Sequence, residues 1–316
     1  IGVAFFIVFV YRGWSTYWVA PIAAVIVAVF NNLNPVEAVT KTFVGGMVDL
    51  IFSLFSIIFL GAILGKIYSD TGAAASIAKT LINRFVIHKQ GKSQIKMAVL
   101  VLFIAFGLFT MGGIDGYTLT FTAFPICMLV AERLNIPRRF VPAMLCLNVA
   151  FMAAPGAPQI NIIMAVAAMA SHGQHITGTV GLIPGFIGVA VIAVLCCITL
   201  YRMIVKAQMN GETFEYGPVQ RIEEEERELP NFWIAIIPLF LVFVLYTLLH
   251  LDIFIALAAG IVSSLLLMSK YIVRKDLYTG SPVGLGKAVI NSLNSGAAVY
   301  PNALIQIIVP SGLAAV

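Results

Sequence analysis

The stretch Phe109-Thr110-Met111-Gly112-Gly113-Ile114-Asp115-Gly116-Tyr117 places one carboxylate among glycines in the middle of an apolar run. Between residues 97 and 131, no Asp, Glu, Lys or Arg is present other than Asp115. A charge at membrane depth is costly, so such a residue is a functional-site hypothesis by default. The stretch therefore raises the question of which kind of membrane protein requires it.

The composition of the chain is that of a helical membrane protein. Its 316 residues are 60% hydrophobic and 10% charged, with a mean hydropathy of +1.00, whereas soluble domains carry roughly 25% charged residues. Several apolar runs approach the roughly 20 residues that cross a bilayer. We expect an all-α, multi-pass protein of the cytoplasmic membrane. The net charge of +5 follows membrane topology and indicates no nucleic-acid binding.

The basic residues indicate which loops share a side of the membrane. All 19 Lys and Arg residues except Lys41 lie at Arg12 or in the loops 66–96, 132–139, 202–230 and 270–287. An excess of Lys and Arg marks cytoplasmic loops. The sequence therefore predicts that these four loops are cytoplasmic.

The segment 97–131 is predicted to be a re-entrant hairpin. Both of its flanks are basic, so it enters and leaves on the cytoplasmic side. Each arm has about 15 residues and would reach roughly 22 Å, short of a hydrocarbon core about 30 Å thick. A glycine-rich tip at that depth is tolerated only where it is buried in protein or lines a watery cavity.

The segment 140–170 is predicted to be a discontinuous helix. Its interruption reads Ala154-Pro155-Gly156-Ala157-Pro158-Gln159, and two prolines with a glycine disrupt the helical ladder. A broken helix exposes N–H and carbonyl groups that can bind ions near the bilayer centre. The alternative is a plain proline kink, although Asn148, Gln159 and Asn161 gather polar groups around the break.

The chain is predicted to contain a first transmembrane repeat over 1–206, a cytoplasmic linker over 207–230 and the start of a second, inverted repeat over 231–316. The segment 34–41 is echoed by 281–287, and 69–74 by 310–315. Inverted repeats with broken helices are typical of secondary transporters; chance similarity between short strings is the alternative. Because the chain begins and ends within apolar runs, we expect it to be a fragment, with the second repeat incomplete.

Three stretches resemble those of the gluconate permease (gluconate:proton symporter) family of the ion transporter superfamily. They are 61–74, the hairpin through Asp115-Gly116 and the break 154–159. At the break, carriers of gluconate in this family have Pro-His-Pro-Gly-Pro, where this chain has Ala154-Pro155-Gly156-Ala157-Pro158. The resemblance implies a two-repeat fold with a scaffold and a mobile transport domain, a homodimer and an elevator motion.

The hairpin tip and the break together are predicted to bind substrate. Glycine backbone lets N–H groups approach a carboxylate closely, and the polar side chains would bond hydroxyls or carboxylate oxygens. We expect no catalytic residue, metal or cofactor. The predicted substrate-binding residues are Gly112, Gly113, Asp115, Gly116, Thr118, Asn148, Pro155, Gly156, Pro158, Gln159 and Asn161.

Asp115 is predicted to carry the coupling proton. An ionised Asp would repel an organic anion in the same site, but burial disfavours the charged form of a carboxyl group. Asp115 would then take up a proton with the substrate and release it inside, with sodium as the other possible coupling ion. The alternative is that Asp115 caps the second hairpin helix.

The predicted function is secondary active transport, not enzymatic catalysis. We expect proton-coupled symport of a small organic anion, such as a gluconate-like sugar acid or a related hydroxy acid. One alternative is a citrate or dicarboxylate carrier of the same superfamily. Another is an intramembrane aspartyl protease, which needs two carboxylates that share a proton; here the second candidate is Asp49 alone. The expected partners are the anion, the proton, the lipid bilayer and a second copy of the chain.

Overall fold

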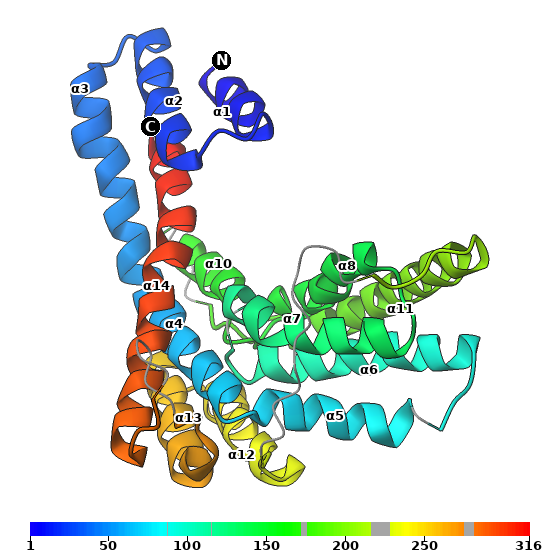
Figure 1. Ribbon diagram of the computed structural model, residues 1–316. Helices are drawn as coiled ribbons and strands as arrows, with labels where there is room; N and C mark the ends of the chain where they lie inside the picture. Colours follow the sequence, from blue (N-terminus) through cyan, green and yellow to red (C-terminus); the bar gives the residue numbers. More distant parts are fainter. Residues whose placement is uncertain (87, 115, 172–175, 216–227, 275–280) are drawn as a thin grey trace. The chain divides into compact units, whose positions relative to one another are not determined.

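The computed structural model is helical, with no β-sheet among the residues that it describes (Figure 1). The described residues are 1–86, 88–114, 116–171, 176–215, 228–274 and 281–316. The predicted all-α class is confirmed. The inverted relation of two repeats and the re-entry of the hairpin stay predictions.

The helices divide into two compact units. The first contains Ile1–Ile58 and Ala298–Val316, and the second contains Phe59–Ala297. The helices α4 (Val44–Asp70) and α14 (Leu285–Ala315) each contribute to both. These are units of packing, and the predicted division at residues 206 and 231 stays a prediction.

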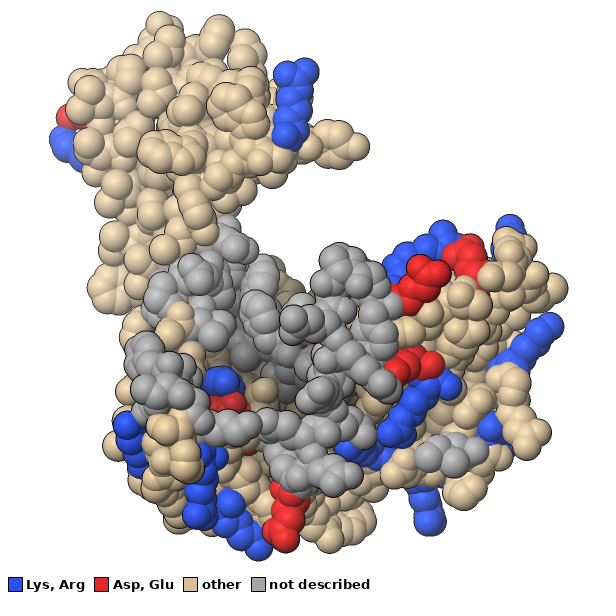
Figure 2. Space-filling model, in the orientation of Figure 1, with Lys and Arg blue, Asp and Glu red and all other residues tan. Residues whose placement is uncertain are grey.

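The first unit is built around small residues. Ala20, Ala24, Phe43 and Val309 form its buried cluster, and Gly312 of α14 lies against the backbone of Phe43. In a membrane, the hydrophobic effect does not drive helices together. Small residues stabilise helix packing there because they let the backbones approach closely. Charged side chains are sparse on this unit (Figure 2). Its other helical segments are α1 (Gly2–Tyr11), α2 (Thr16–Phe30), α3 (Pro35–Glu37) and the π-helical η1 (Ala38–Phe43).

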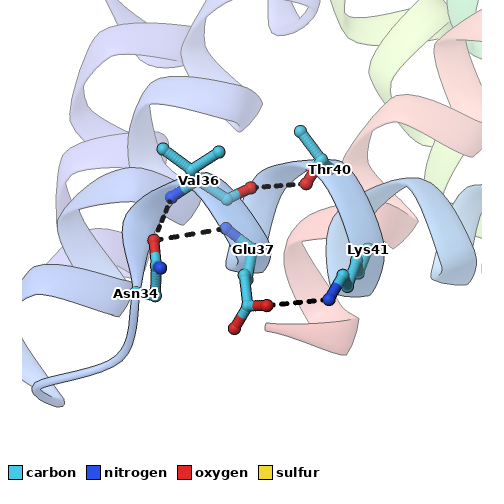
Figure 3. A network of polar contacts seen from close by, with 5 residues as sticks. All are labelled: Asn34, Val36, Glu37, Thr40 and Lys41. Carbon is cyan, nitrogen blue, oxygen red and sulfur yellow. Dashed lines mark hydrogen bonds and ion pairs between the residues drawn. The ribbon is translucent and has the colours of Figure 1, made fainter.

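A capped turn leads from α2 into α3 (Figure 3). The Asn34 Oδ1 accepts hydrogen bonds from the backbone N–H groups of Val36, at 3.0 Å, and Glu37, at 3.5 Å, and Pro35 takes the first helical position, where no N–H is needed. One turn later, Lys41 Nζ lies 2.7 Å from Glu37 Oε1. The one Lys predicted to lie outside the cytoplasmic loops is thus paired with an acidic neighbour.

The second unit contains the hairpin and the broken helix. The hairpin helix α6 (Lys92–Met111) packs against both α5 (Ala73–Phe85) and α11 (Leu182–Met209) (Figure 1). Its partner arm is α7 (Gly116–Arg133). The remaining segments are η2 (Arg138–Phe140), α8 (Val141–Leu145), η3 (Cys146–Asn148), α9 (Val149–Met152), α10 (Ile160–Ser171), α12 (Phe232–Phe243), η4 (Val244–Leu248), α13 (Ile253–Met268) and η5 (Ser269–Tyr271).

Two buried hydroxyl groups connect α4 and α5 to α12 and to the residue shortly before it. Tyr68 Oη donates a hydrogen bond to the Ala235 carbonyl oxygen at 2.6 Å, and Ser76 Oγ donates one to the Pro230 carbonyl oxygen at 2.6 Å. Buried hydroxyl groups are costly without a partner. These contacts fix α12 against α4 and α5, and so position α12 beside the hairpin.

The hairpin arms are longer than the sequence suggested. Helix α6 has 20 residues and α7 has 18, which corresponds to about 30 Å and about 27 Å. The expectation of arms of about 15 residues was wrong because residues 92–96 continue α6. Arm length therefore no longer favours re-entry over a full crossing.

Three helices among the described residues are long and apolar enough to cross a membrane. They are Gly91–Met111, Leu182–Met209 and Ile253–Tyr271, and Pro35–Phe52 with Ile57–Asp70 would make a fourth if counted as one span. Large apolar side chains of α11, including Ile183, Val194 and Leu195, are exposed. Such a face is suited to lipid, which agrees with a membrane protein.

Candidate functional site

The hairpin tip is a helix cap built on a glycine. Gly113, at φ +88°, ends α6. The N–H of Gly113 donates to the Thr110 carbonyl oxygen at 3.2 Å, and the N–H of Ile114 donates to the Phe109 carbonyl oxygen at 3.0 Å. This pair of bonds is a Schellman motif. Asp115 and the side chain of Thr118, both predicted site residues, lie outside the described part of the chain.

The predicted break is present between Met152 and Ile160, where α9 ends and α10 begins. Gly156 makes the turn at φ +79°. Its N–H donates to the Gly178 carbonyl oxygen at 2.8 Å, and the N–H of Ala157 donates to the Ala154 carbonyl oxygen at 3.0 Å. The segment is therefore a folded connection with its own internal hydrogen bonds, not a simple kink.

These hydrogen bonds correct one expectation about anion binding. The N–H groups of Gly112, Gly113 and Gly156 all donate to backbone carbonyl groups. They are not available to a carboxylate in this conformation, because the cap and the turn use them. At the start of α10, the N–H groups of Ile162 and Ile163 both donate to the Gln159 carbonyl oxygen, at 3.1 Å and 3.2 Å.

Gln159 joins the tip to the break. Its side chain is fully buried. The Nε2 group donates to the carbonyl oxygen of Thr110 at 2.9 Å and to that of Ile114 at 3.1 Å. Pro158 also faces the tip, with its Cγ 3.7 Å from the position of a Cβ on Gly113. The two interruptions meet through Gln159, whose partners Thr110 and Ile114 lie 49 and 45 positions earlier in the chain.

The remaining predicted residues differ in their surroundings. Asn148 is buried, and its Nδ2 lies 3.8 Å from Met152 Sδ. Met152 in turn occupies the space beside Gly116 at the start of α7. Pro155 packs on Gly185 of α11, whereas Asn161 is exposed on α10. The structure brings Gly112, Gly113, Pro158 and Gln159 together and leaves Asn161 outside that cluster.

Thr247 is a residue that sequence reasoning missed. It is 3% exposed, and its Oγ1 donates to the Gly156 carbonyl oxygen at 2.7 Å. Thr247 belongs to η4, a π-helical turn, and such turns are frequent at functional sites. The signal in the sequence was slight: Tyr246 and Thr247 interrupt an otherwise apolar run over 232–249.

A cavity of about 390 Å³ lies beside the tip, and its lining excludes it as the anion site. Every residue around it is apolar: Ile104, Gly107, Leu108, Met111, Gly112, Phe151, Phe186, Ile236, Leu239, Phe240 and Phe243. An ionised carboxylate without a polar partner would be strongly disfavoured there. Within the described ranges, no group of three or more His, Cys, Asp or Glu side chains is placed to hold a metal ion.

Comparison with known proteins identifies relatives of the chain. Residues 1–271 match the model of the GntP family permease. The chain is 32% identical over 156 residues to the "Uncharacterized transporter YxjC" of Bacillus subtilis (strain 168), covering 48% of the chain and 31% of that protein. It is 28% identical over 236 residues to the "Gnt-II system L-idonate transporter" of Escherichia coli (strain K12), covering 70% of the chain and 48% of that protein. The matched region thus spans less than half the length of each relative.

Proposed function

The chain belongs to the GntP family of permeases, and from this membership we propose that it carries a small organic anion across the cytoplasmic membrane together with a proton. Membership places it among membrane transporters and not among enzymes, which speaks against the aspartyl protease alternative. One relative is named for L-idonate, a sugar acid. We propose a substrate of that class, with one carboxylate and several hydroxyl groups.

The junction of the tip and the break is the observation that carries the proposal. Two interruptions of helical backbone meet there through Gln159. Helix interruptions in transporters present backbone dipoles to a substrate at mid-membrane. We assign the substrate carboxylate to the N-terminal end of α10, where the helix dipole favours an anion. The side chains around the junction would then contact the rest of the substrate.

Asp115 is proposed as the group that couples transport to the proton gradient. It follows the cap residues Gly113 and Ile114 directly in sequence. A neutral Asp115 would permit an anion to bind nearby, and an ionised Asp115 would oppose it. Uptake would therefore bring in one proton with each substrate molecule. The alternative to be tested against proton coupling is that sodium is the coupling ion.

The assembly is proposed to be a homodimer in the lipid bilayer, with the hairpin and the broken helix moving as one body against a scaffold. Support comes from the bonds of Gln159, which hold the tip and the break together. In this proposal those bonds persist through the transport cycle. The contacts of the tip and break with α12, η4 and α13 are the ones that change.

Counterflow in proteoliposomes tests the function. Vesicles loaded with an unlabelled C6 aldonate should accumulate the labelled aldonate from outside when they contain the protein. An inward proton gradient should drive uptake, and a protonophore should abolish that drive. Exchange of citrate or dicarboxylates without aldonate exchange would favour the other branch of the superfamily and contradict the proposal.

A further inference from the structure

We propose that Gln159 Oε1 accepts a hydrogen bond from one substrate hydroxyl group, and so makes the site select hydroxy acids over acids that carry carboxylates alone. This inference rests on the proposed function, since it names Oε1 as the atom that recognises the substrate in the same site. According to this inference, one oxygen atom determines the specificity for a sugar acid over a hydroxyl-free carboxylic acid.

The orientation of the Gln159 amide follows from its neighbours. Nε2 faces two carbonyl oxygens, those of Thr110 and Ile114, at 2.9 Å and 3.1 Å. An amide nitrogen has two hydrogens to donate, and both are used here. Exchange of the amide oxygen and nitrogen would place Oε1 against two acceptors. The side-chain oxygen must therefore point away from the tip carbonyl groups.

Oε1 itself is a buried acceptor to which no group in the described ranges donates. Buried polar atoms in native proteins are nearly always hydrogen-bonded, and an exception calls for an explanation. The neighbours of Gly113 on the α12 and α13 side are the side chains of Val242 and Leu257. Neither of these two side chains can donate a hydrogen bond.

The chemistry of an amide oxygen determines what it can recognise. It accepts a hydrogen bond from a hydroxyl group, whereas an ionised carboxylate has acceptors only. A carboxylate oxygen near Oε1 would be repelled, and a methylene group would leave Oε1 unpaired. A site built to bond a hydroxyl group discriminates strongly against the analogue that lacks it. Between a hydroxy acid and a hydroxyl-free carboxylic acid, the hydroxy acid is therefore the substrate that satisfies Oε1.

Access to Oε1 requires a movement that leaves the amide in place. Gln159 is fully buried in this conformation. Contacts that enclose the tip and the break come from Leu257 of α13 and from Thr247 of η4. When these elements move away, Oε1 becomes reachable while the two Nε2 bonds keep the amide orientation fixed.

Inhibition of aldonate counterflow by monodeoxy analogues tests the inference. Each analogue of the transported C6 aldonate lacks one hydroxyl group, and tricarballylate serves as a hydroxyl-free acid. For the wild type we expect one analogue to inhibit about 5- to 100-fold more weakly than the parent acid, as expected for one lost hydrogen bond to a buried acceptor. In Gln159→Leu, that difference at the same position should fall to about 1, because the acceptor is gone.

Gln208→Leu is the matched control. Gln208 Nε2 also donates to two carbonyl oxygens, those of Leu134 and Asn135, both at 2.9 Å, near the other end of the hairpin. The variant Gln208→Leu should keep the wild-type difference in inhibition between the parent acid and the monodeoxy analogue. Equal inhibition by every monodeoxy analogue in the wild type would overturn the inference whether or not Gln159→Leu folds, and so would retained discrimination in Gln159→Leu. Failure of every acid to exchange would instead contradict the proposed function, and the inference with it.

Discussion

The side-chain nitrogen of Gln159 lies 2.9 Å from the carbonyl oxygen of Thr110, a residue 49 positions earlier in the chain. The contact joins the end of the break to the end of α6. Carbonyl groups at a helix C-terminus lack the N–H donor of the next turn. The Thr110 carbonyl oxygen accepts the N–H of Gly113 in the cap and can accept a second donor from outside it. Gln159 provides such a donor in a fully buried place, so each of the two helix interruptions stabilises the other.

Gln159→Leu should destabilise the second compact unit. Leucine keeps the volume of the side chain but removes both donors from the Thr110 and Ile114 carbonyl groups. We expect a loss of about 1–3 kcal/mol, measured as a lower midpoint of thermal unfolding in detergent. Gln208 is half exposed, and its Nε2 bonds are in a partly exposed place. Gln208→Leu should therefore lower the free energy of unfolding by less, because water can replace the lost donor. Equal loss in both variants would argue against a special role for the buried junction.

Thr247→Val should weaken the interaction between η4 and the break. Valine is close to threonine in shape, and the change removes the 2.7 Å hydrogen bond to the Gly156 carbonyl oxygen. A buried carbonyl group without its donor costs about 1–3 kcal/mol. Because this contact is one that we expect to change during transport, the maximal rate should change more than the half-saturation concentration. A change in the half-saturation concentration alone would instead place Thr247 in contact with substrate.

Gly113→Ala should impair folding or transport. The backbone of Gly113 has φ +88°, which side chains other than that of glycine rarely adopt. A Cβ there would also lie 2.5 Å from Leu257 Cδ2. Gly188→Ala on α11 is the control, since a Cβ there meets nothing within 4 Å and alanine favours a helix by about 1 kcal/mol. Levels of folded protein in the membrane, compared by size-exclusion profile, should fall for the first variant only.

The sequence predicted both helix interruptions, but not the hydrogen-bond partners of their backbone groups. Glycines at 112 and 113 and prolines at 155 and 158 predict a tip and a break from local chemistry alone. The bond from Thr247 to Gly156 joins residues 91 positions apart, and no local pattern encodes such a contact. The same holds for the backbone N–H groups of the tip, because the cap that uses them depends on the φ of Gly113.

The start of α6 shows why an estimate of arm length from the apolar run alone was too short. Lys92 and Lys96 read as loop residues because they are charged. In the structure they begin the helix, since Lys is a good helix former and its long side chain can carry the ammonium group toward water. The helix therefore continues beyond the hydrophobic run.

Asp115→Asn separates the two proposed roles of this residue. Asparagine can still cap the first turn of α7 but cannot take up a proton at this position. Counterflow, which needs no net proton movement, should continue in the variant. Uptake driven by an inward proton gradient should be lost. Coupling retained in the variant would contradict the proton-carrying role and leave the capping role, which asparagine preserves.

The measurement that tests the account most directly is the proton movement that accompanies transport in proteoliposomes. Vesicles that contain the protein and a trapped pH indicator receive a C6 aldonate at equal pH on both sides. The account predicts that the interior acidifies with the wild type, in proportion to the aldonate taken up, and not with Asp115→Asn. Aldonate uptake without acidification, or acidification that Asp115→Asn leaves unaltered, would contradict proton-coupled transport through this site.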